Sequence, residues 1–261
     1  MKKEVDKVTI RRFTENGVTR LEDTVASEFS LTIILNGKEV VTLFCSPAEL
    51  DYLAVGFLLA EGRLKDKDEI SQMEIDETAG VARIATRNSN SPPAEHANRR
   101  FIASGGGRGA SLYDNINIQE PAPIKSQIHI SPEQVFGLME RFIQHSEIFK
   151  ATGGVHSAAL CDAGSLLAFS EDIGRHNAID KIFGRCWLED IATDNRIVIT
   201  SGRISSEILL KVARRNVPIL ISKSAPTNLG INLARELGIT LLGFVREKRI
   251  NAYTNDWRLV P

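Results

Sequence analysis

The segment "RIVITSGRISSEILLKVARRNVPILISKSAPTNLGINLARELGITLLGFV", residues 196–245, decides the fold of the second half of the chain. Three apolar runs in it predict strands over 196–200, 217–223 and 239–245, and helices are expected between them, near 204–216 and 226–237. Apolar strands that alternate with helices are typical of a parallel sheet covered on both faces. We therefore expect an α/β architecture here.

The sequence before this segment extends the same domain. "SPEQVFGLMERFIQHSEIF", residues 131–149, predicts a helix that Ser131 caps. "VHSAAL" (155–160) and "SLLAFS" (165–170) predict strands, and "GRHNAIDKIFGRCWL" (174–188) predicts a helix. We expect a three-layer C-terminal α/β domain over residues 126–261.

The first part of the chain predicts a smaller α+β domain over residues 1–125. "LTIILNGKEVVTLF" carries an Asn36-Gly37 hairpin turn between two strand-forming runs. "SPAELDYLAVGFLLAEG" follows and predicts a helix with Ser46 as its N-cap. A second hairpin is expected around the "ETAG" turn at 77–80. Two hairpins around one helix suggest a β-grasp-like arrangement.

Composition excludes several classes of protein. The 32 basic and 33 acidic residues among 261 leave a net charge of −1. The protein therefore has no overall positive charge that could attract the phosphates of a nucleic acid. The longest apolar run, "YLAVGFLLA", is too short to cross a bilayer, and the N-terminus has no apolar signal-peptide core. We expect a cytoplasmic protein with no nucleic-acid or membrane partner.

The three cysteines, Cys45, Cys161 and Cys186, are far apart and have no C-x-x-C spacing. This excludes a disulfide framework and a cysteine zinc site, and no other metal site is expected. The thiols should be reduced and mostly buried. Cys161, near the "DAG" turn at 162–164, is expected to be the most reachable.

Polar residues follow each strand of the predicted parallel sheet. Ligands of such sheets bind outside the carboxyl ends of the strands, where helix N-termini present free N–H groups. Turns rich in Ser, Gly and Arg suit a phosphate-bearing ligand. The alternative is that these residues only cap helices and form turns. The candidates are Ser201, Gly202 and Arg203, then Ser224, Pro226 and Thr227, and finally Arg246, Lys248 and Arg249.

"EDIGRHNAIDK", residues 171–181, supplies a fourth group. Arg175, His176 and Asn177 lie in the first turn of the predicted helix, and Asp180 follows His176 by four residues. A His–Asp pair at this spacing could fix a tautomer or hold a charged imidazole for a ligand. The alternative is a solvated helix start with ordinary side-chain pairs.

His156 stands at the head of the strand predicted over 155–160, directly after Gly153-Gly154. A histidine there is more often structural than catalytic, but its position makes it a further candidate. A catalytic pair with Ser157 is excluded, because adjacent residues of a strand point to opposite faces.

With these segments in place, the sequence resembles the FdhD family of formate dehydrogenase accessory proteins. The resemblance is carried by "NGKEVVTLFCSPAELDYLAVGFLLAEG", "TGGVHSAAL", "EDIGRHNAIDKIFG", "TSGRISSEILLK" and "SAPTNLGINLARELGITLLGFVR". It implies a cytoplasmic sulfur carrier between a cysteine desulfurase and the bis-molybdopterin guanine dinucleotide cofactor of formate dehydrogenase. It also implies a homodimer and a C-terminal half that resembles the cytidine deaminase fold.

The resemblance further implies that a guanine nucleotide or the cofactor contacts the segment "FVREKR". Its residues are Phe244, Val245, Arg246, Glu247, Lys248 and Arg249.

The family's sulfur-carrying loop usually reads S-C-G-x-C-G, and the matching stretch here is "SGGGRG", residues 104–109. Gly105 and Arg108 occupy the cysteine positions, and a shift of register by one residue places Gly106 there. Glycine and arginine provide no sulfur for a persulfide. The stretch also fits a G-x-G-x-x-A dinucleotide fingerprint at 105–110, but the helix that this motif requires is not predicted to follow.

Two functions remain open from the sequence. One is a sulfurtransferase-type accessory protein, acting through a displaced cysteine. The other is a chaperone that binds the molybdenum cofactor without a covalent step. A deaminase is excluded, because the chain has neither H-x-E after its candidate His156 nor a C-x-x-C pair.

Overall fold

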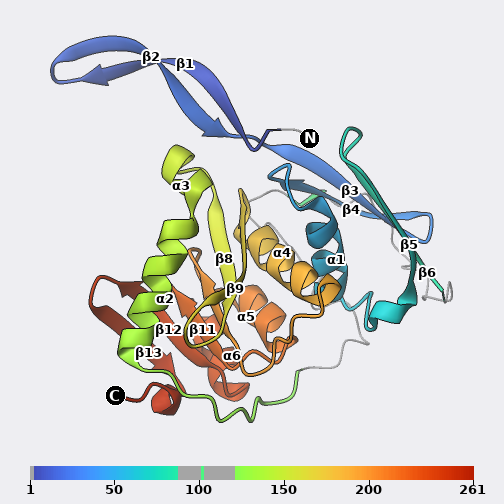
Figure 1. Ribbon diagram of the computed structural model, residues 1–261, viewed down its shortest axis with the longest axis vertical. Coiled ribbons are helices and arrows are strands. Elements are labelled where there is room, and N and C mark those ends of the chain that lie inside the picture. Colours follow the sequence, from blue (N-terminus) through green and yellow to red (C-terminus); the bar gives the residue numbers. More distant parts are fainter. Residues whose placement is uncertain (1–2, 88–100, 103–120) are drawn as a thin grey trace.

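The computed structural model describes residues 3–87, 101–102 and 121–261 (Figure 1). In the C-terminal half, a six-stranded sheet runs in the order β13-β12-β11-β10-β8-β9. Its strands are β8 (His156–Cys161), β9 (Leu166–Asp172), β10 (Ile197–Thr200), β11 (Ile219–Ser222), β12 (Thr240–Arg246) and β13 (Arg249–Thr254). The predicted β10, β11 and β12 are parallel, whereas β8, β9 and β13 pair antiparallel.

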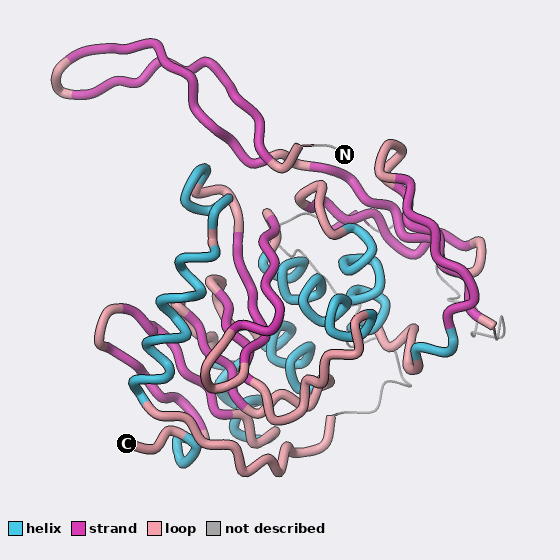
Figure 2. The backbone as a smooth tube through the Cα atoms, in the orientation of Figure 1, coloured by secondary structure: helices cyan, strands magenta, loops and turns pink. Residues whose placement is uncertain are grey.

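Helices cover both faces of this sheet. Apolar residues of α4 (Arg175–Leu188), α5 (Ser206–Ala213) and α6 (Asn228–Glu236) pack in one core on one face. On the other face, α2 (Pro132–His145) packs through residues such as Val135 and Phe142. The predicted α/β class is therefore confirmed, with a three-layer arrangement in this half (Figure 2).

The N-terminal half holds a second sheet with the strand order β5-β6-β3-β4-β7. The elements are β3 (Phe29–Leu35), β4 (Lys38–Cys45), α1 (Leu50–Ala60), the 3-10 turn η1 (Lys67–Glu69), β5 (Ile70–Asp76), β6 (Val81–Thr86) and β7 (Phe101–Ile102). The hairpin turn lies at Asn36-Gly37, where both residues have positive φ. Because β6 lies parallel to β3, the arrangement is β-grasp-like, as predicted.

The N-terminal half has one apolar core and the C-terminal half has two. One core contains residues of β3, β4 and α1, and the other two lie on the faces of the six-stranded sheet. Ile124, placed before the predicted boundary at 125/126, packs in the C-terminal core. The boundary itself stays a prediction.

The two halves meet where α1 crosses α4, and the backbones of the two helices lie in close contact at this crossing. A Cβ atom on Gly56 would lie 1.9 Å from the Asp180 carbonyl oxygen, and one on Gly184 would lie 1.9 Å from the Tyr52 carbonyl oxygen. Since neither glycine has positive φ, it is the close approach of the two helices that requires them.

Two predicted details differ from the structure. Helix α1 begins at Leu50, with Glu49 at the N-cap position that was predicted for Ser46, because buried Ser46 is bonded to the C-terminal half instead. Its N–H donates to Asp172 Oδ2 at 3.0 Å, and its hydroxyl accepts from Ile173 N at 3.1 Å. The helix predicted over 131–149 is interrupted at Ser146, after which α3 (Glu147–Thr152) begins.

The N-terminal arm was not predicted from the sequence; it is a hairpin of β1 (Val5–Thr14) and β2 (Gly17–Ala26) that extends away from the rest of the protein (Figure 1). Strand β13 and the 3-10 turn η2 (Asp256–Arg258) near the C-terminus were not predicted either.

Candidate anion-binding site

The candidate residues gather at the edge of the six-stranded sheet where β10, β11 and β12 end. Because β8 is antiparallel to β10, it starts at this same edge, and β9 ends beside it at Asp172. Helix α4 begins there at Arg175. The topology therefore brings His156, the first turn of α4, the strand-to-helix turns after β10 and β11, and the β12–β13 hairpin turn to one end of the sheet.

Ser201, in the turn after β10, is hydrogen-bonded to the start of β8. Its hydroxyl accepts a hydrogen bond from Ser157 N at 2.9 Å, and its N–H donates to Ser157 O at 3.0 Å. The same hydroxyl lies 3.3 Å from His156 Nδ1. Ser157 Oγ contacts Glu171 Oε1 instead, at 3.2 Å, so the two neighbours have separate environments.

Arg175, Gly202 and Arg203 form the most basic part of the site. A Cβ atom on Gly202 would lie 2.9 Å from Arg175 Cβ, so the glycine admits the arginine against the turn. Burial, followed by the charge of Arg203, lowers the pKa of Arg175, while Glu207 opposes this shift. An anion bound between the two guanidinium groups would relieve their repulsion.

His156 lies in the same positive field. Burial is the largest cause that lowers its pKa, followed by the charge of Arg175, and Arg203 acts in the same direction. Asp172 opposes them. The imidazole is therefore held toward its neutral form until a negative charge is added nearby.

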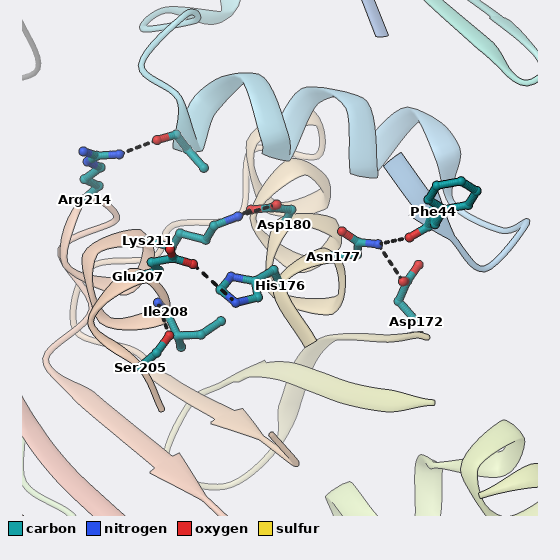
Figure 3. Close-up of polar contacts among 11 residues, drawn as sticks. Phe44, Asp172, His176, Asn177, Asp180, Ser205, Glu207, Ile208, Lys211 and Arg214 are labelled. Atoms are coloured by element: carbon teal, nitrogen blue, oxygen red, sulfur yellow. Dashed lines mark hydrogen bonds and ion pairs between the residues drawn. The ribbon is translucent and has the colours of Figure 1, made fainter. Parts of the chain in front are cut away.

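His176 is buried behind this cluster, against α5. Its Nε2 lies 3.6 Å from Glu207 Oε2, in the first turn of that helix (Figure 3). This contact ties the start of α4 to the start of α5.

The turns after β11 and β12 continue the site along the edge. Ser222 Oγ donates to Gly202 O at 2.8 Å, which joins the β11 end to the β10 turn. Ser224 O accepts from Phe244 N at 3.0 Å. Pro226 forms a bridge to Ile204, and Thr227 caps α6 by accepting from Gly230 N. For Thr227, the contacts therefore match the simple capping role.

Phe244 is the unusual residue of the β12 end, because its φ is +51°. The guanidinium carbons of Arg246 and Arg249 lie 5.7 and 5.8 Å from its ring centroid. Arg246, Glu247, Lys248 and Arg249 form the exposed β12–β13 hairpin. An aromatic ring flanked by two cations suits a planar group that carries phosphate. Val245, by contrast, points into the apolar core.

Asn177 and Asp180 face away from the sheet edge (Figure 3). Asn177 Nδ2 donates to Phe44 O at 2.9 Å and to Asp172 Oδ1 at 2.8 Å, so it bridges the two halves of the chain. The Asp180 carboxylate forms a buried ion pair with Lys211. Their contacts are structural, and the expected partner of His176 at this helix start is replaced by Glu207.

The three thiols are buried. Burial is the main cause that raises the pKa of Cys45, Cys161 and Cys186 to about 12 in each case. The expected burial of the thiols is confirmed, but the expectation that Cys161 would be the most reachable of the three is wrong, because it pairs with Ile197 inside the sheet and is 0% exposed. Gly105, Gly106 and Arg108 lie outside the described residues.

Two contributors escaped the sequence analysis. Lys223, directly after β11, places its Nζ 5.9 Å from the ring centroid of Phe149 in α3. Glu207 pairs with His176. Lys223 is the last residue of the strand predicted over 217–223, and this position could have identified it, whereas nothing in the local sequence pointed to Phe149.

The donors at this edge fit phosphate groups better than a metal ion. They are guanidinium, ammonium and imidazole groups, and the acids near them are Glu207, Glu247 and the buried Asp172, whose carboxylate is already paired with Lys181. Across 3–87 and 121–261, no cluster of three potential metal-ligating side chains occurs. No helix in the described part of the chain has the length and apolar character needed to cross a membrane.

The sequence is similar to those of known proteins. Residues 26–260 match the model of the FdhD/NarQ family. The chain is 43% identical over 258 residues to the sulfur carrier protein FdhD of Bacillus subtilis (strain 168), covering 97% of this chain and 98% of that protein. It is 40% identical over 260 residues to the sulfur carrier protein FdhD of Listeria innocua, covering 98% of both.

A solved structure is also similar. It is that of a protein assigned as a formate dehydrogenase accessory protein from Desulfotalea psychrophila. The TM-score is 0.82 at 25% identity, and the alignment covers 99% of this chain and all of that one (100%).

Proposed function

Because the chain belongs to the FdhD/NarQ family, we propose that it is an accessory protein of formate dehydrogenase maturation that acts as a sulfur carrier. One observation carries the proposal: the similarity to proteins named sulfur carrier protein FdhD extends through 97% of the chain. In this role, sulfur passes from a cysteine desulfurase to the bis-molybdopterin guanine dinucleotide cofactor. The protein works in the cytoplasm as a homodimer.

The basic sheet edge is the proposed binding site for this cofactor. The cofactor supplies phosphate groups and guanine bases, and Arg175 and Arg203 provide fixed positive charge for the phosphates. Phe244, with Arg246 and Arg249 beside its ring, provides a surface for a base. A free guanine nucleotide carries the same two groups and would bind in the same way.

Sulfur transfer requires an accessible thiolate. In the exchange, the thiolate attacks the terminal sulfur of the desulfurase persulfide, a new S–S bond forms, the old one breaks, and the desulfurase thiolate leaves. Cys45, Cys161 and Cys186 are the only cysteines of the chain, and all three are buried with raised pKa values. A carrier step would need one of them to become exposed.

This burial favours a second candidate, a chaperone that binds the molybdenum cofactor without a covalent step. It keeps the same site and the same formate dehydrogenase partner, and differs only in needing no thiol. The sequence supports it independently, because Gly105 and Arg108 stand in the family's cysteine positions.

Intact-protein mass spectrometry after incubation with a cysteine desulfurase and cysteine separates the two candidates. An added sulfur that maps to one cysteine, and is lost when that cysteine is replaced by alanine, supports the carrier. No adduct, together with retained binding of guanosine diphosphate, supports the chaperone. No adduct and no nucleotide binding would contradict both.

A further inference from the structure

A cavity lies beside β9, which is the end strand of the six-stranded sheet. Its walls come from the residue before β1, the loop before α1, the start of α3 and the end of β9. Its volume is about 240 Å³, below the range of about 300–1,000 Å³ that is typical of pockets for drug-sized ligands. The cavity therefore has room for a small molecule or for one side chain of another protein.

Three carboxylates line this cavity, those of Glu4, Glu49 and Glu171. In the part of the chain that the structure describes, none of them forms an ion pair. Glu171 is held by uncharged donors instead, because its carboxylate accepts from Ile148 N at 2.9 Å and from Phe149 N at 3.1 Å. The cavity thus gathers negative charge without a counter-charge.

Glu49 responds to this surplus of negative charge. Burial is the largest cause that raises its pKa, and the charge of Glu4 acts in the same direction. The two cations that oppose the shift lie on α4 and are already paired with other acids, Lys181 with Asp172 at 2.8 Å and Arg185 with Glu189 at 3.2 Å. A cation bound in the cavity would stabilise the ionised form of Glu49.

Ser170 indicates independently that a ligand enters the cavity. The residue lines the cavity and is only 2% exposed. Its hydroxyl lies close enough to Glu49 to lower the pKa of that carboxyl, but it has no partner within hydrogen-bond distance. Buried hydroxyl groups of native proteins are normally paired, because an unpaired one has lost its bonds to water. The oxygen of Ser170 can accept a hydrogen bond from an N–H group of a ligand.

The walls favour an extended organic cation over a metal ion. Within the described ranges, no three potential metal-ligating side chains come together closely enough to hold an ion. A guanidinium group spreads five N–H donors over a plane, which suits acceptors that come from separate segments. Ala48, Ile148 and Phe169 provide apolar wall for an aliphatic stem, and the ring of Phe169 can also face a cation.

We propose that this cavity binds an alkylguanidinium group, either of a small molecule or of an arginine side chain in another protein. The cavity is acidic where the anion-binding edge is basic, so the two sites take ligands of opposite charge. The proposal therefore does not depend on the proposed function.

NMR titration of the isotope-labelled full chain tests the proposal with two probes. Agmatine represents a free small molecule, and acetyl-arginine methylamide represents an arginine side chain in a protein. Binding should shift the backbone signals of Ile148, Ser170 and Glu171, which line the cavity. Binding of agmatine alone would identify a small molecule as the ligand, whereas binding of both probes would support an arginine side chain. Failure of both probes to bind in the millimolar range would overturn the proposal.

Glu49→Gln should raise the dissociation constant of agmatine at least about tenfold, because it removes a charged partner of the guanidinium group. Glu15→Gln is the matched control. Glu15 is exposed in the turn between β1 and β2, so this variant should bind as the wild type does. Wild-type affinity in Glu49→Gln would contradict the site.

Ser170→Ala separates binding from a structural role. It should raise the dissociation constant of agmatine about 2- to 12-fold, because one hydrogen bond to the ligand is lost. It should not lower the thermal midpoint of the unbound protein, since the hydroxyl has no partner there to lose. A lower midpoint with unchanged affinity would overturn the assignment. Nucleotide binding and the sulfur adduct of the proposed function are measured separately, so either can fail without the other.

Discussion

Lys181 supports the junction between the two halves of the protein through its ion pair with Asp172. It is fully buried, and its Nζ lies 2.8 Å from Asp172 Oδ2 and 3.1 Å from the Glu171 carbonyl oxygen. Asp172 also accepts from Ser46 N and from Asn177 Nδ2. One buried ion pair thus holds the segment before α1 against the turn from which Arg175 projects.

Replacing Lys181 with methionine should lower the free energy of unfolding by about 3–5 kcal/mol, because it leaves the carboxylate of Asp172 buried without its counter-charge. Urea denaturation measures the change. Lys7→Met is the matched control, since Lys7 pairs with Glu22 at 3.8 Å with 73% and 69% of the two side chains exposed. That variant should lose less than about 1 kcal/mol. Equal losses would contradict the assigned role of Lys181.

His156 should make stability depend on pH. Its pKa is lowered in the folded protein, mainly by burial and then by Arg175, so the unfolded chain binds the proton more readily. The contribution of neutral His156 is therefore complete above its unfolded pKa of about 6.5 and is lost as the pH falls below that value. His156→Asn should show a smaller loss of stability than the wild type between pH 7.5 and 5 in urea denaturation. Parallel curves would show that His156 does not titrate in this way.

At this scale the sequence predicted which residues reach the sheet edge better than what they contact. Ser201 and Arg203 could be placed because each follows a recognisable strand. The roles of Asn177 and Asp180 could not, since their partners Phe44 and Lys211 are distant in sequence. Spacing within one helix contains no information about a neighbouring element.

Among the elements, the crossing of α1 and α4 limits which substitutions the fold accepts. Gly56→Ala should destabilise the protein by about 3 kcal/mol, because the added methyl group would overlap the Asp180 carbonyl oxygen and the helices would have to separate. Thermal unfolding monitored by circular dichroism measures this. Gly137→Ala in α2 is the control: a Cβ atom there meets nothing within 4 Å, so the variant should gain about 0.5–1 kcal/mol. A neutral Gly56→Ala would contradict the close helix crossing.

Local signals predicted the elements where they were strong. The Asn36-Gly37 turn and the Ser131 cap are both found, and the structure adds that Ser131 forms a capping box with Gln134. Ser46 carried the same kind of signal but lies bonded to Asp172, 126 residues away. The arm was missed because its strands mix charged and apolar residues on both faces, so they lack the alternation that predicts a strand.

Across the whole molecule, the basic edge lies where three parallel strands of the larger sheet end, with His156 and the first turn of α4 beside them. The chain order of strands and helices was sufficient to predict this edge, because parallel strands end on the same side. The sequence could not predict how deeply the three cysteine side chains are buried, because their burial depends on the packing of both halves. We therefore propose that a ligand binds at this edge of the sheet and not at a thiol.

Isothermal titration calorimetry of guanosine diphosphate tests this claim most directly, with the wild type, Arg203→Ala and Arg246→Ala measured side by side. Loss of a charged hydrogen bond to phosphate costs about 1.5–3 kcal/mol, so the dissociation constant of each variant should rise about 10- to 150-fold. Lys38→Ala, on the N-terminal hairpin, is the control and should bind as the wild type does. Wild-type affinity in both arginine variants, or no binding by the wild type, would contradict the site.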